Sequence, residues 1–407
     1  MTKKSDAPAI RFKGFSDAWE QRKLGELVDR VVRKNTNNES TLPLTISAQY
    51  GLVDQITYFN NRVASRDVSN YYLVLNGEFA YNKSTSDGYP FGAVKRLDLY
   101  EKGVLSTLYI VFSPKKEQQV DSDFLTVFFD TDRWHKGVAE RAAEGARNHG
   151  LLNISAEDFF DIDLSVPKDV AEQKQIGAFI RQLDNLITLH QRKFEKLTNV
   201  KKSMLEKMFP QNGSSYPEIR FKGFTDPWEQ RKFSELVQIE RGGSPRPIDD
   251  FITDAPNGLN WVKIGDAPTQ GNYITKTAEK IRPEGLSKTR EVHPGDLILS
   301  NSMSFGKPYI MGIDGCIHDG WLLIRNTYGV FDLTFLCHLL GTPQMLSQYR
   351  SLAAGSTVNN LNKELVENTV VTIPSITEQR VLGDYLEQLD NLITLHQREL
   401  EKLQNIK

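Results

Sequence analysis

Two stretches of the chain carry apolar residues spaced alternately four and three positions apart, a period that over several heptads is typical of a coiled coil. We predict two long helices that pair in an antiparallel coiled coil. The predicted interface residues are Ile180, Leu183, Ile187, His190, Phe194 and Leu197 in the first stretch and Leu386, Leu389, Ile393, His396, Leu400 and Leu403 in the second. The seam continues to Met208 in the first stretch and to Lys407 in the second.

Each predicted helix has a start signal just after a proline. Asp169 and Ser375 are predicted N-caps, and Glu172 and Glu378 are predicted to complete capping boxes at the third helical position. The first helix would be about 55 Å long at 1.5 Å per residue. The second seam stops one heptad earlier than the first, so we expect a shorter second helix.

The regions before the two helices have a different pattern. Short apolar runs such as Tyr71–Leu75, Leu108–Phe112 and Asp296–Ser300 are broken by Gly, Pro, Asn and Asp, which predicts strands and turns. Asn76–Ser84 and Pro294–Ser302 both consist of a turn, a short apolar strand and a polar loop. We therefore expect two mixed α+β globular domains, in the broad α/β class, that share a fold but not a surface.

The chain repeats itself at the ends of these regions. QLDNLITLHQR occurs unchanged at Gln182–Arg192 and Gln388–Arg398, and IRFKGFSDAWEQRKLGEL at Ile10–Leu27 returns as IRFKGFTDPWEQRKFSEL at Ile219–Leu236. The regions between these repeated segments diverge. The pattern indicates an internal duplication with pseudo-two-fold symmetry, in which one scaffold carries two different surfaces.

These observations predict four segments. They are a first globular domain at 1–168, a first long helix at 169–210, a second globular domain at 211–374 with a linker at 211–218, and a second long helix at 375–407.

Composition narrows the class of protein. At 407 residues the chain exceeds the usual size of one domain, and 39% apolar residues suffice for a core. The two cysteines form no CxxC pair, which excludes a disulfide framework or a zinc site of that type. The chain shows no signal-peptide or membrane-span pattern, so we expect a cytoplasmic protein. With a net charge of −2, any binding of nucleic acid must come from local patches.

The architecture resembles the specificity subunit of Type I restriction-modification enzymes. The resemblance rests on FKGFSDAWEQRKLGEL and FKGFTDPWEQRKFSEL at the two openings, on SAQYGLVDQ and YNKSTSDGYPFGAVK in the first middle, and on the PxxxxEQ segment beginning at Pro167. The second such segment, PSITEQ, has one residue fewer before its EQ. The resemblance implies that each variable domain reads one half of a bipartite, asymmetric DNA target, while the helices set the distance between the halves.

The resemblance also implies the partners. They are double-stranded DNA with a bipartite target, two methylation subunits that dock on the helices, and restriction and translocation subunits, with no membrane. The chain itself would be non-catalytic and hold no cofactor, because S-adenosylmethionine, ATP and Mg²⁺ would be bound by the partner subunits.

Two other functions remain open from the residues alone. One is a two-headed scaffold that binds proteins without DNA specificity. The other is a metal-dependent nuclease that uses Asp161, Asp163, Glu172 and Lys174, although the capping box already accounts for Glu172. The chain has no adenine-methylation motif, Walker A loop or HExxH motif. His190 and His396 occupy the same seam position, where a polar residue usually fixes register.

Candidate DNA contacts are basic and amide side chains in turn-rich loops, because these groups form paired hydrogen bonds with guanine or adenine edges. In the first domain they are Lys83, Lys95, Arg96, Arg147, Asn148 and His149. In the second they are Arg241, Ser244, Arg246, Asn301, Ser302, Lys307, Asn359 and Asn360.

Overall fold

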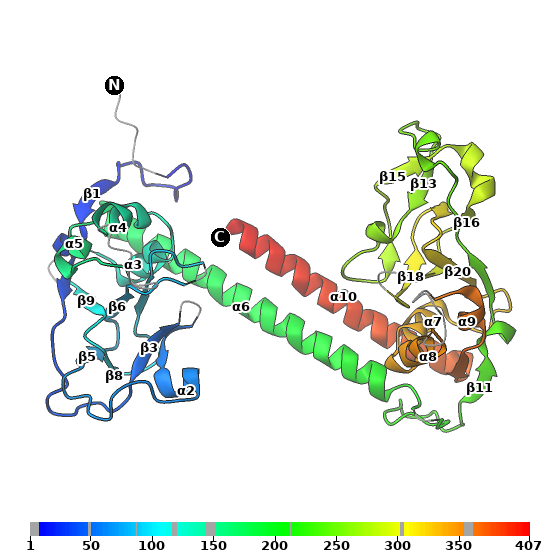
Figure 1. The fold of residues 1–407 in the computed structure, drawn as a ribbon, viewed down its shortest axis with the longest axis horizontal. Helices are drawn as coiled ribbons and strands as arrows, with labels where there is room; N and C mark the ends of the chain where they lie inside the picture. Colours follow the sequence, from blue (N-terminus) through cyan, green and yellow to red (C-terminus); the bar gives the residue numbers. More distant parts are fainter. Residues whose placement is uncertain are drawn as a thin grey trace. The chain divides into compact units, whose positions relative to one another are not determined.

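The computed structural model describes residues 8–47, 50–86, 88–115, 120–142, 152–211, 213–301, 305–353 and 361–407. The chain forms two compact units (Figure 1). The first comprises Met1–Leu186 and Lys407, and the second comprises Ile187–Ile406. In the described ranges, no helix is long and apolar enough to cross a membrane.

The first unit contains a mixed set of short strands and helices followed by the start of one long helix. The strands are β1 (Glu20–Lys23), β2 (Val28–Arg30), β3 (Leu44–Ser47), β4 (Gly51–Asp54), β5 (Tyr72–Leu75), β6 (Phe79–Asn82), β7 (Ala93–Arg96), β8 (Lys102–Leu105), β9 (Ile110–Pro114) and β10 (Asp163–Val166). The helices are α1 (Leu24–Leu27), α2 (Gln55–Phe59), α3 (Ser122–Phe129), α4 (His135–Arg141), α5 (Ala156–Phe160) and α6 (Val170–Lys207), which continues into the second unit.

The second unit has the same general order. Its strands are β11 (Glu229–Lys232), β12 (Gln238–Arg241), β13 (Leu259–Val262), β14 (Tyr273–Ile274), β15 (Glu279–Ile281), β16 (Arg290–Val292), β17 (Leu297–Ser300), β18 (Pro308–Met311), β19 (Gly315–Ile317), β20 (Trp321–Arg325) and β21 (Val370–Ile373). Its α-helices are α7 (Leu333–Leu340), α8 (Pro343–Ala353), α9 (Lys363–Glu367) and α10 (Ile376–Ile406), and its short 3₁₀ helices are η1 (Phe233–Glu235), η2 (Ile248–Asp250), η3 (Ile264–Asp266) and η4 (Pro283–Lys288).

The main sheets of the two units share the order of four strands. The first is β2-β9-β6-β7 and the second is β12-β20-β17-β18-β14. All three pairings in the first sheet are antiparallel, as are the three matching pairings in the second. The two segments that looked alike in sequence form β6 and β17, which occupy the same place in their sheets. The prediction of a shared mixed α+β fold is therefore confirmed.

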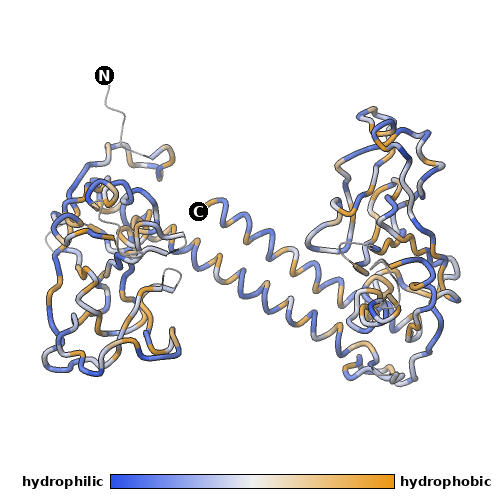
Figure 2. The backbone as a smooth tube through the Cα atoms, viewed as in Figure 1, coloured by the Kyte–Doolittle hydropathy of each residue, from blue (hydrophilic) through white to orange (hydrophobic). Residues whose placement is uncertain are grey.

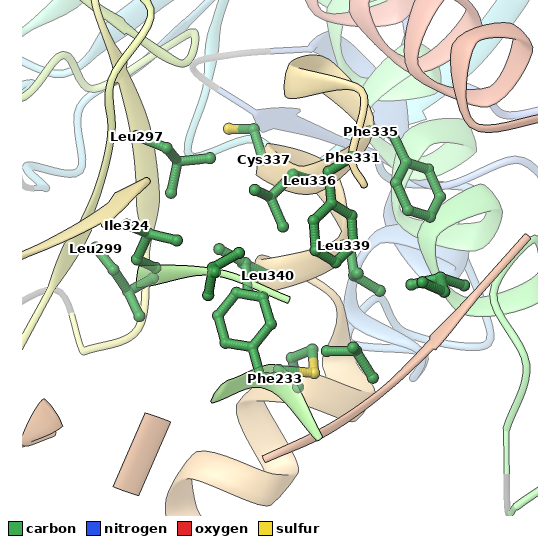
Figure 3. Packing of buried hydrophobic residues seen from close by; sticks show 14 of the residues in the cluster. Phe233, Leu297, Leu299, Ile324, Phe331, Phe335, Leu336, Cys337, Leu339 and Leu340 are labelled. Carbon is green, nitrogen blue, oxygen red and sulfur yellow. The ribbon is translucent and has the colours of Figure 1, made fainter. Parts of the chain in front are cut away.

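Each main sheet separates two apolar cores, because successive residues of a strand point to opposite faces. In β17, Leu297 and Leu299 face the larger core, where Figure 3 shows them with Phe335 and Leu336 of α7. Ile298, between them, belongs to the smaller core on the other face. In the first unit β6 alternates in the same way: Phe79 and Tyr81 lie in one core and Ala80 in the other.

The repeated opening segment Ile10–Leu27 (the opening signature) contacts the PxxxxEQ segment at the start of α6 in the first unit. The carboxylate of Glu172 accepts two hydrogen bonds from Arg11, Nε to Oε1 at 2.8 Å and Nη2 to Oε2 at 2.7 Å, and a third from Trp19 Nε1 at 3.4 Å. Only 2% of the Glu172 side chain is exposed. β1 of the opening signature pairs with β10, just before α6. The two ends of the globular domain are thus joined at the start of the helix.

The second unit repeats this joint. Arg220 donates from Nε and Nη2 to the carboxylate of Glu378, both at 2.8 Å, and Trp228 Nε1 donates to it at 3.3 Å. The neighbouring glutamines also match, because Gln173 accepts from the backbone N–H of Asp121 and Gln379 from that of Asp332. β11 pairs with β21 just before α10. Equivalent contacts therefore attach each globular domain to the start of its long helix.

These contacts correct the predicted capping boxes. Asp169 Oδ1 accepts from Ala171 N at 2.7 Å and Ser375 Oγ accepts from Glu378 N at 3.4 Å, so both are N-caps as predicted. The two glutamates, however, bind an arginine and a tryptophan of the opening signature. An arginine offers a paired, charge-assisted geometry that a single backbone N–H cannot match.

The helix pair is confirmed as an antiparallel contact within the second unit. Lys201 of α6 pairs with Asp390 of α10 at 2.5 Å, and the Nδ1 atoms of His190 and His396 lie 3.1 Å apart. Figure 2 shows that both helices are largely hydrophilic, as expected for helices with one apolar stripe. α6 has 38 residues and α10 has 31, one heptad fewer.

Burial along the predicted seam is uneven. The buried members are Leu183, Leu386, Leu389, Ile393 and Leu400, and the half-buried members are Ile180, Ile187, His190, Phe194, Leu197, His396 and Leu403. Leu197, Val200 and Met204 of α6 pack on the larger core of the second unit, as do Leu382, Leu386 and Leu389 of α10. The C-terminal part of α6 and the N-terminal part of α10 are thus part of that core.

Candidate nucleic-acid interface

Two candidates in the first domain are engaged in the fold. Arg96, at the end of β7, donates to Asp98 at 2.7 Å and to Asp123 of α3 at 2.8 Å, and its side chain is only 9% exposed. Lys95 pairs with Asp130 at 2.6 Å. Both cations are thus paired with carboxylates of their own domain.

The other first-domain candidates are Lys83 and the run Arg147, Asn148 and His149. Lys83 is half-buried just after β6, and its Nζ donates to the backbone carbonyl of Ile154 at 3.3 Å. Arg147, Asn148 and His149 lie outside the described residues.

In the second domain, three candidates meet at one aspartate that the sequence did not single out. Ser244 Oγ donates to Asp319 Oδ1 at 3.0 Å, and Arg246 Nη2 approaches Asp319 Oδ2 at 3.5 Å. Asn301 Nδ2 donates to the backbone carbonyl of Asp319 at 2.8 Å. The loop after β12, the end of β17 and the turn between β19 and β20 are thereby held together around Asp319, and we call these residues the Asp319 cluster.

His318 completes the cluster. Its Nδ1 accepts from the backbone N–H of Gly320 at 2.9 Å, so the proton of the neutral ring lies on Nε2, which faces Asp319 Oδ1 at 3.0 Å. Both nitrogens of His318 are thus used within the turn. The ring supports the carboxylate of Asp319, which in turn holds Ser244 and Arg246.

Arg246 is the exposed member of the cluster. Its side chain is 80% exposed, whereas Asn301 is only 5% exposed. Arg246 also lines an open cavity of about 1100 Å³, together with Lys263, Trp261 and His318. A guanidinium has five N–H donors. The single long contact with Asp319 leaves most of the Arg246 donors available for a ligand in this cavity.

The remaining second-domain candidates are dispersed. Arg241 is exposed at the end of β12, and Lys307 places its ammonium 4.9 Å from the centre of the Tyr309 ring. Ser302, Asn359 and Asn360 lie outside the described residues.

The residues of the alternative nuclease site do not form a metal centre. Asp161 and Asp163 share Lys23 as an ion-pair partner, and Glu172 is occupied by Arg11. Lys174, one residue beyond Gln173, is exposed on α6. Within the ranges that the structure describes, no group of three or more histidine, cysteine or acidic residues is arranged to hold a metal ion.

The two thiols are unsuited to nucleophilic chemistry. Burial raises the pKa of Cys316 to about 11 and that of Cys337 to about 12. Both thiols therefore stay protonated at neutral pH and behave as small apolar side chains.

Asp319 and His318 were missed in the sequence because they lie in a short turn, HDG, between two apolar strands. A turn of this composition is ordinary in any globular protein. Only the three-dimensional convergence of Ser244, Arg246 and Asn301 distinguishes it.

The fold and the site define a class of protein: an internally duplicated chain with two domains of one topology, two different loop surfaces, and a helix pair built from the repeated segments. Comparison with known proteins supports this class. A family model for the Type I restriction modification DNA specificity domain matches residues 17–199 and again residues 225–405. The chain therefore belongs to the family of Type I restriction-modification DNA specificity proteins, and its role is non-catalytic recognition of DNA sequence within such a system.

Individual relatives extend over nearly the whole chain. The Type I restriction enzyme MjaVIII specificity subunit of Methanocaldococcus jannaschii is 24% identical over 367 residues, covering 86% of this chain and 81% of that protein. The putative type I restriction enzyme MjaX specificity subunit of the same organism is 20% identical, covering 96% and 91%. The crystal structure of a Type-I restriction-modification system S subunit from M. genitalium has the same fold, with a TM-score of 0.58, 14% identity, and coverage of 98% and 96%.

Proposed function

We propose that this chain reads a bipartite, asymmetric DNA target, with one half-site read by each globular domain. The proposed domains are 1–168 and 211–374, and the helices at 169–210 and 375–407 set the distance between the half-sites. The observation that carries the proposal is the pairing of one strand order, β2-β9-β6-β7 and β12-β20-β17-β18, with two different sets of loops. Two scaffolds that share one order of four strands but carry different loops suit two readers of different sequences.

For the second domain, we propose that the Asp319 cluster is part of the reading surface. Arg246 would contact a guanine edge through the guanidinium N–H groups that Asp319 does not engage, since arginine pairs with guanine O6 and N7. Asp319, Ser244 and His318 would hold that side chain in position. Exposed Arg241 would contact a phosphate, which fixes register without reading sequence.

The helices are the proposed docking site for two methylation subunits. Leu186 and Leu189 of α6 are 43% and 46% exposed, and their repeats Leu392 and Leu395 of α10 are 43% and 51% exposed. Exposed leucines are not needed for a seam, yet they recur in two identical segments. Two copies of one apolar surface suit two copies of one partner.

The chemistry would come from other chains acting with this one on DNA in the cytoplasm. Adenine methylation with S-adenosylmethionine would belong to the methylation subunits, and ATP- and Mg²⁺-dependent translocation and cleavage to the restriction subunits.

Exchange of the middle of the second domain tests the proposal. Val237–Asn360 would be replaced by the corresponding segment of another member of the family, and the methylated motif of the complex would be determined by sequencing cellular DNA. We expect one half of the motif to change and the other to stay. A change in both halves, or in neither, contradicts two independent readers.

Arg246→Ala tests the proposed contact in the same assay. We expect discrimination at one base pair of one half-site to fall, by about 1–3 kcal/mol as for other paired arginine–guanine contacts. Arg231→Ala is the matched control, because Arg231 lies on β11 and pairs with Glu235 on the scaffold. An unchanged motif in Arg246→Ala would remove this residue from the reading surface.

A further inference from the structure

The second domain has one additional strand in its main sheet. β14 pairs in parallel with β18 at the sheet edge, and the described part of the first domain contains no matching strand. The segment around β14 reaches α10. Tyr273 Oη donates to Glu387 Oε1 at 2.8 Å, and Asn272 Nδ2 donates to Asp390 Oδ2 at 2.7 Å. The additional strand therefore brings a polar contact to the long helix.

Asp390 connects this contact to the other helix. Its Oδ1 accepts from Lys201 of α6 at 2.5 Å, while Oδ2 accepts from Asn272 and lies 3.7 Å from His338 Nε2 of α7. The Asp390 and Lys201 side chains are only 12% and 20% exposed. One carboxylate thus holds α6, α10 and the sheet edge together. We call Asn272, Tyr273, Glu387, Asp390 and Lys201 the latch.

Beyond the joint that both domains share, the first domain contacts its helix differently, although the helices are repeats. The position equivalent to Glu387 is Arg181, which pairs with Asp123 of α3 at 2.6 Å. That contact involves the helix layer of the domain, whereas the latch involves the sheet itself. The latch is therefore an addition in the second half of the repeat.

The sheet gives the latch a direct route to the reading surface. β14 is hydrogen-bonded to β18 and β18 to β17, and β17 ends at Ser300 beside Asn301 of the Asp319 cluster. Strands joined by backbone hydrogen bonds turn as one body. The orientation of the cluster therefore follows from how the sheet edge is held on the helices.

We infer that the latch is a positioning site that fixes the angle of the second reading domain on the helix pair, and so restricts the complex to one gap between half-sites. The inference rests on the proposed function, because a gap has meaning only for a bipartite target. Loosening the latch would let the domain tilt and accept neighbouring gaps, while the bases that it reads would stay the same.

The test uses the double variant Asn272→Ala, Tyr273→Phe in the full complex with its methylation subunits, because both changes remove donors and leave the charged pair in place. We expect methylation at sites with a gap one base pair longer or shorter to rise about tenfold relative to wild type, as expected for the loss of one or two hydrogen bonds. The half-site sequences should not change. Motif sequencing of cellular DNA reports both quantities.

Two further variants separate positioning from stability. Tyr328→Phe alters an exposed tyrosine of the same domain and should leave the gap unchanged. Glu387→Gln keeps an acceptor for Tyr273 and should retain the wild-type gap. A double variant that folds as wild type and keeps one gap overturns the inference, and so does uniform loss of methylation at every gap. Neither result bears on the domain exchange, which tests the proposed function separately.

Discussion

At the scale of single residues, the buried arginine–glutamate pairs explain why the two ends of each domain are repeated. Glu378 is almost fully buried, and two arginine donors and one indole donor share its carboxylate. A buried carboxylate that loses its partner keeps the cost of leaving water without the compensating attraction.

Arg220→Ala should therefore destabilise the second unit by about 3–5 kcal/mol, the usual result of removing one member of a buried pair. Thermal or denaturant unfolding measures the change. Arg231→Ala removes an exposed pair with Glu235 and should change stability by less than about 1 kcal/mol. Similar losses of stability in both variants would show that burial of the Arg220–Glu378 pair does not increase its contribution to the free energy of unfolding.

His338 makes the second unit sensitive to acid. Burial, reinforced by the nearby Lys201 ammonium, lowers its pKa to about 4. In the unfolded chain the pKa is about 6.5, so between these values the unfolded state binds the proton and the folded state does not. Stability contributed by neutral His338 is complete above about pH 6.5 and falls as the pH decreases towards 4.

Unfolding of wild type and His338→Gln should be compared from pH 7 to pH 4. We expect the wild type to lose on the order of 3 kcal/mol more than the variant over this range. Carboxylates that titrate in the same range affect both proteins and cancel in the comparison. Parallel pH profiles would mean that the pKa of His338 is the same in the folded and unfolded states.

At the scale of elements, two glycines let the long helices approach the domains closely. A Cβ on Gly383 of α10 would lie 2.8 Å from Asp332 Oδ1 and 2.9 Å from Phe335 N, at the start of α7. A Cβ on Gly177 of α6 would lie 2.9 Å from the backbone nitrogen of Phe124, at the start of α3. The same helix-on-helix approach occurs in both halves.

Gly383→Ala should destabilise the second unit by about 1–3 kcal/mol through overpacking, although alanine usually stabilises a helix by about 1 kcal/mol relative to glycine. Gly265→Ala is a suitable control, because nothing lies within 4 Å of its Cβ position. A stabilised Gly383→Ala variant would contradict the close approach of α10 and α7.

The two faces of α10 should respond differently to substitution. Leu386 is fully buried, so Leu386→Ala should cost about 2–5 kcal/mol of stability. Leu392 and Leu395 are exposed, so the double change to alanine should barely alter the unfolding of the isolated chain. We expect the double variant to lose assembly with the methylation subunits, which size-exclusion chromatography would measure. Wild-type assembly would exclude this apolar face as the docking surface.

Sequence patterns predicted these elements well where a period or a repeat was available. The heptad spacing identified both long helices, and the resemblance of Asn76–Ser84 to Pro294–Ser302 placed β6 and β17. Glu172 was misread because its spacing from Asp169 fits a local motif, whereas its partner Arg11 is 161 residues away. The repetition of both Arg and Glu in each half was a usable signal for that contact.

The candidate interface was much less predictable. Arg96 and Arg246 are both arginines in turn-rich segments, yet one is buried among carboxylates and the other is exposed beside a cavity. Sequence gives residue type but not burial or distant partners. The latch was unforeseeable for the same reason, since Asn272 and Asp390 are 118 residues apart.

At the scale of the whole molecule, the proposed spacing role of the helices can be measured directly. Four residues add about 6 Å to a helix, and successive base pairs are about 3.4 Å apart. Insertion of four seam-compatible residues after Leu197, with a matching insertion after Leu403, should lengthen the gap by one or two base pairs. The half-site sequences should be unchanged in motif sequencing. An active complex with an unchanged gap would show that the helices do not set the spacing.

The joints at Arg11–Glu172 and Arg220–Glu378 also bear on how such a chain can evolve. Each joint holds the first and last segments of a globular domain together. The polypeptide between these segments is therefore a loop whose two ends are fixed. The entropy of closing a loop grows only slowly, by about 0.6 kcal/mol for each doubling of its length. Insertions, deletions or wholesale replacement between the joints therefore leave the course of the helix almost undisturbed, and new specificities can arise without redesign of the assembly that uses them.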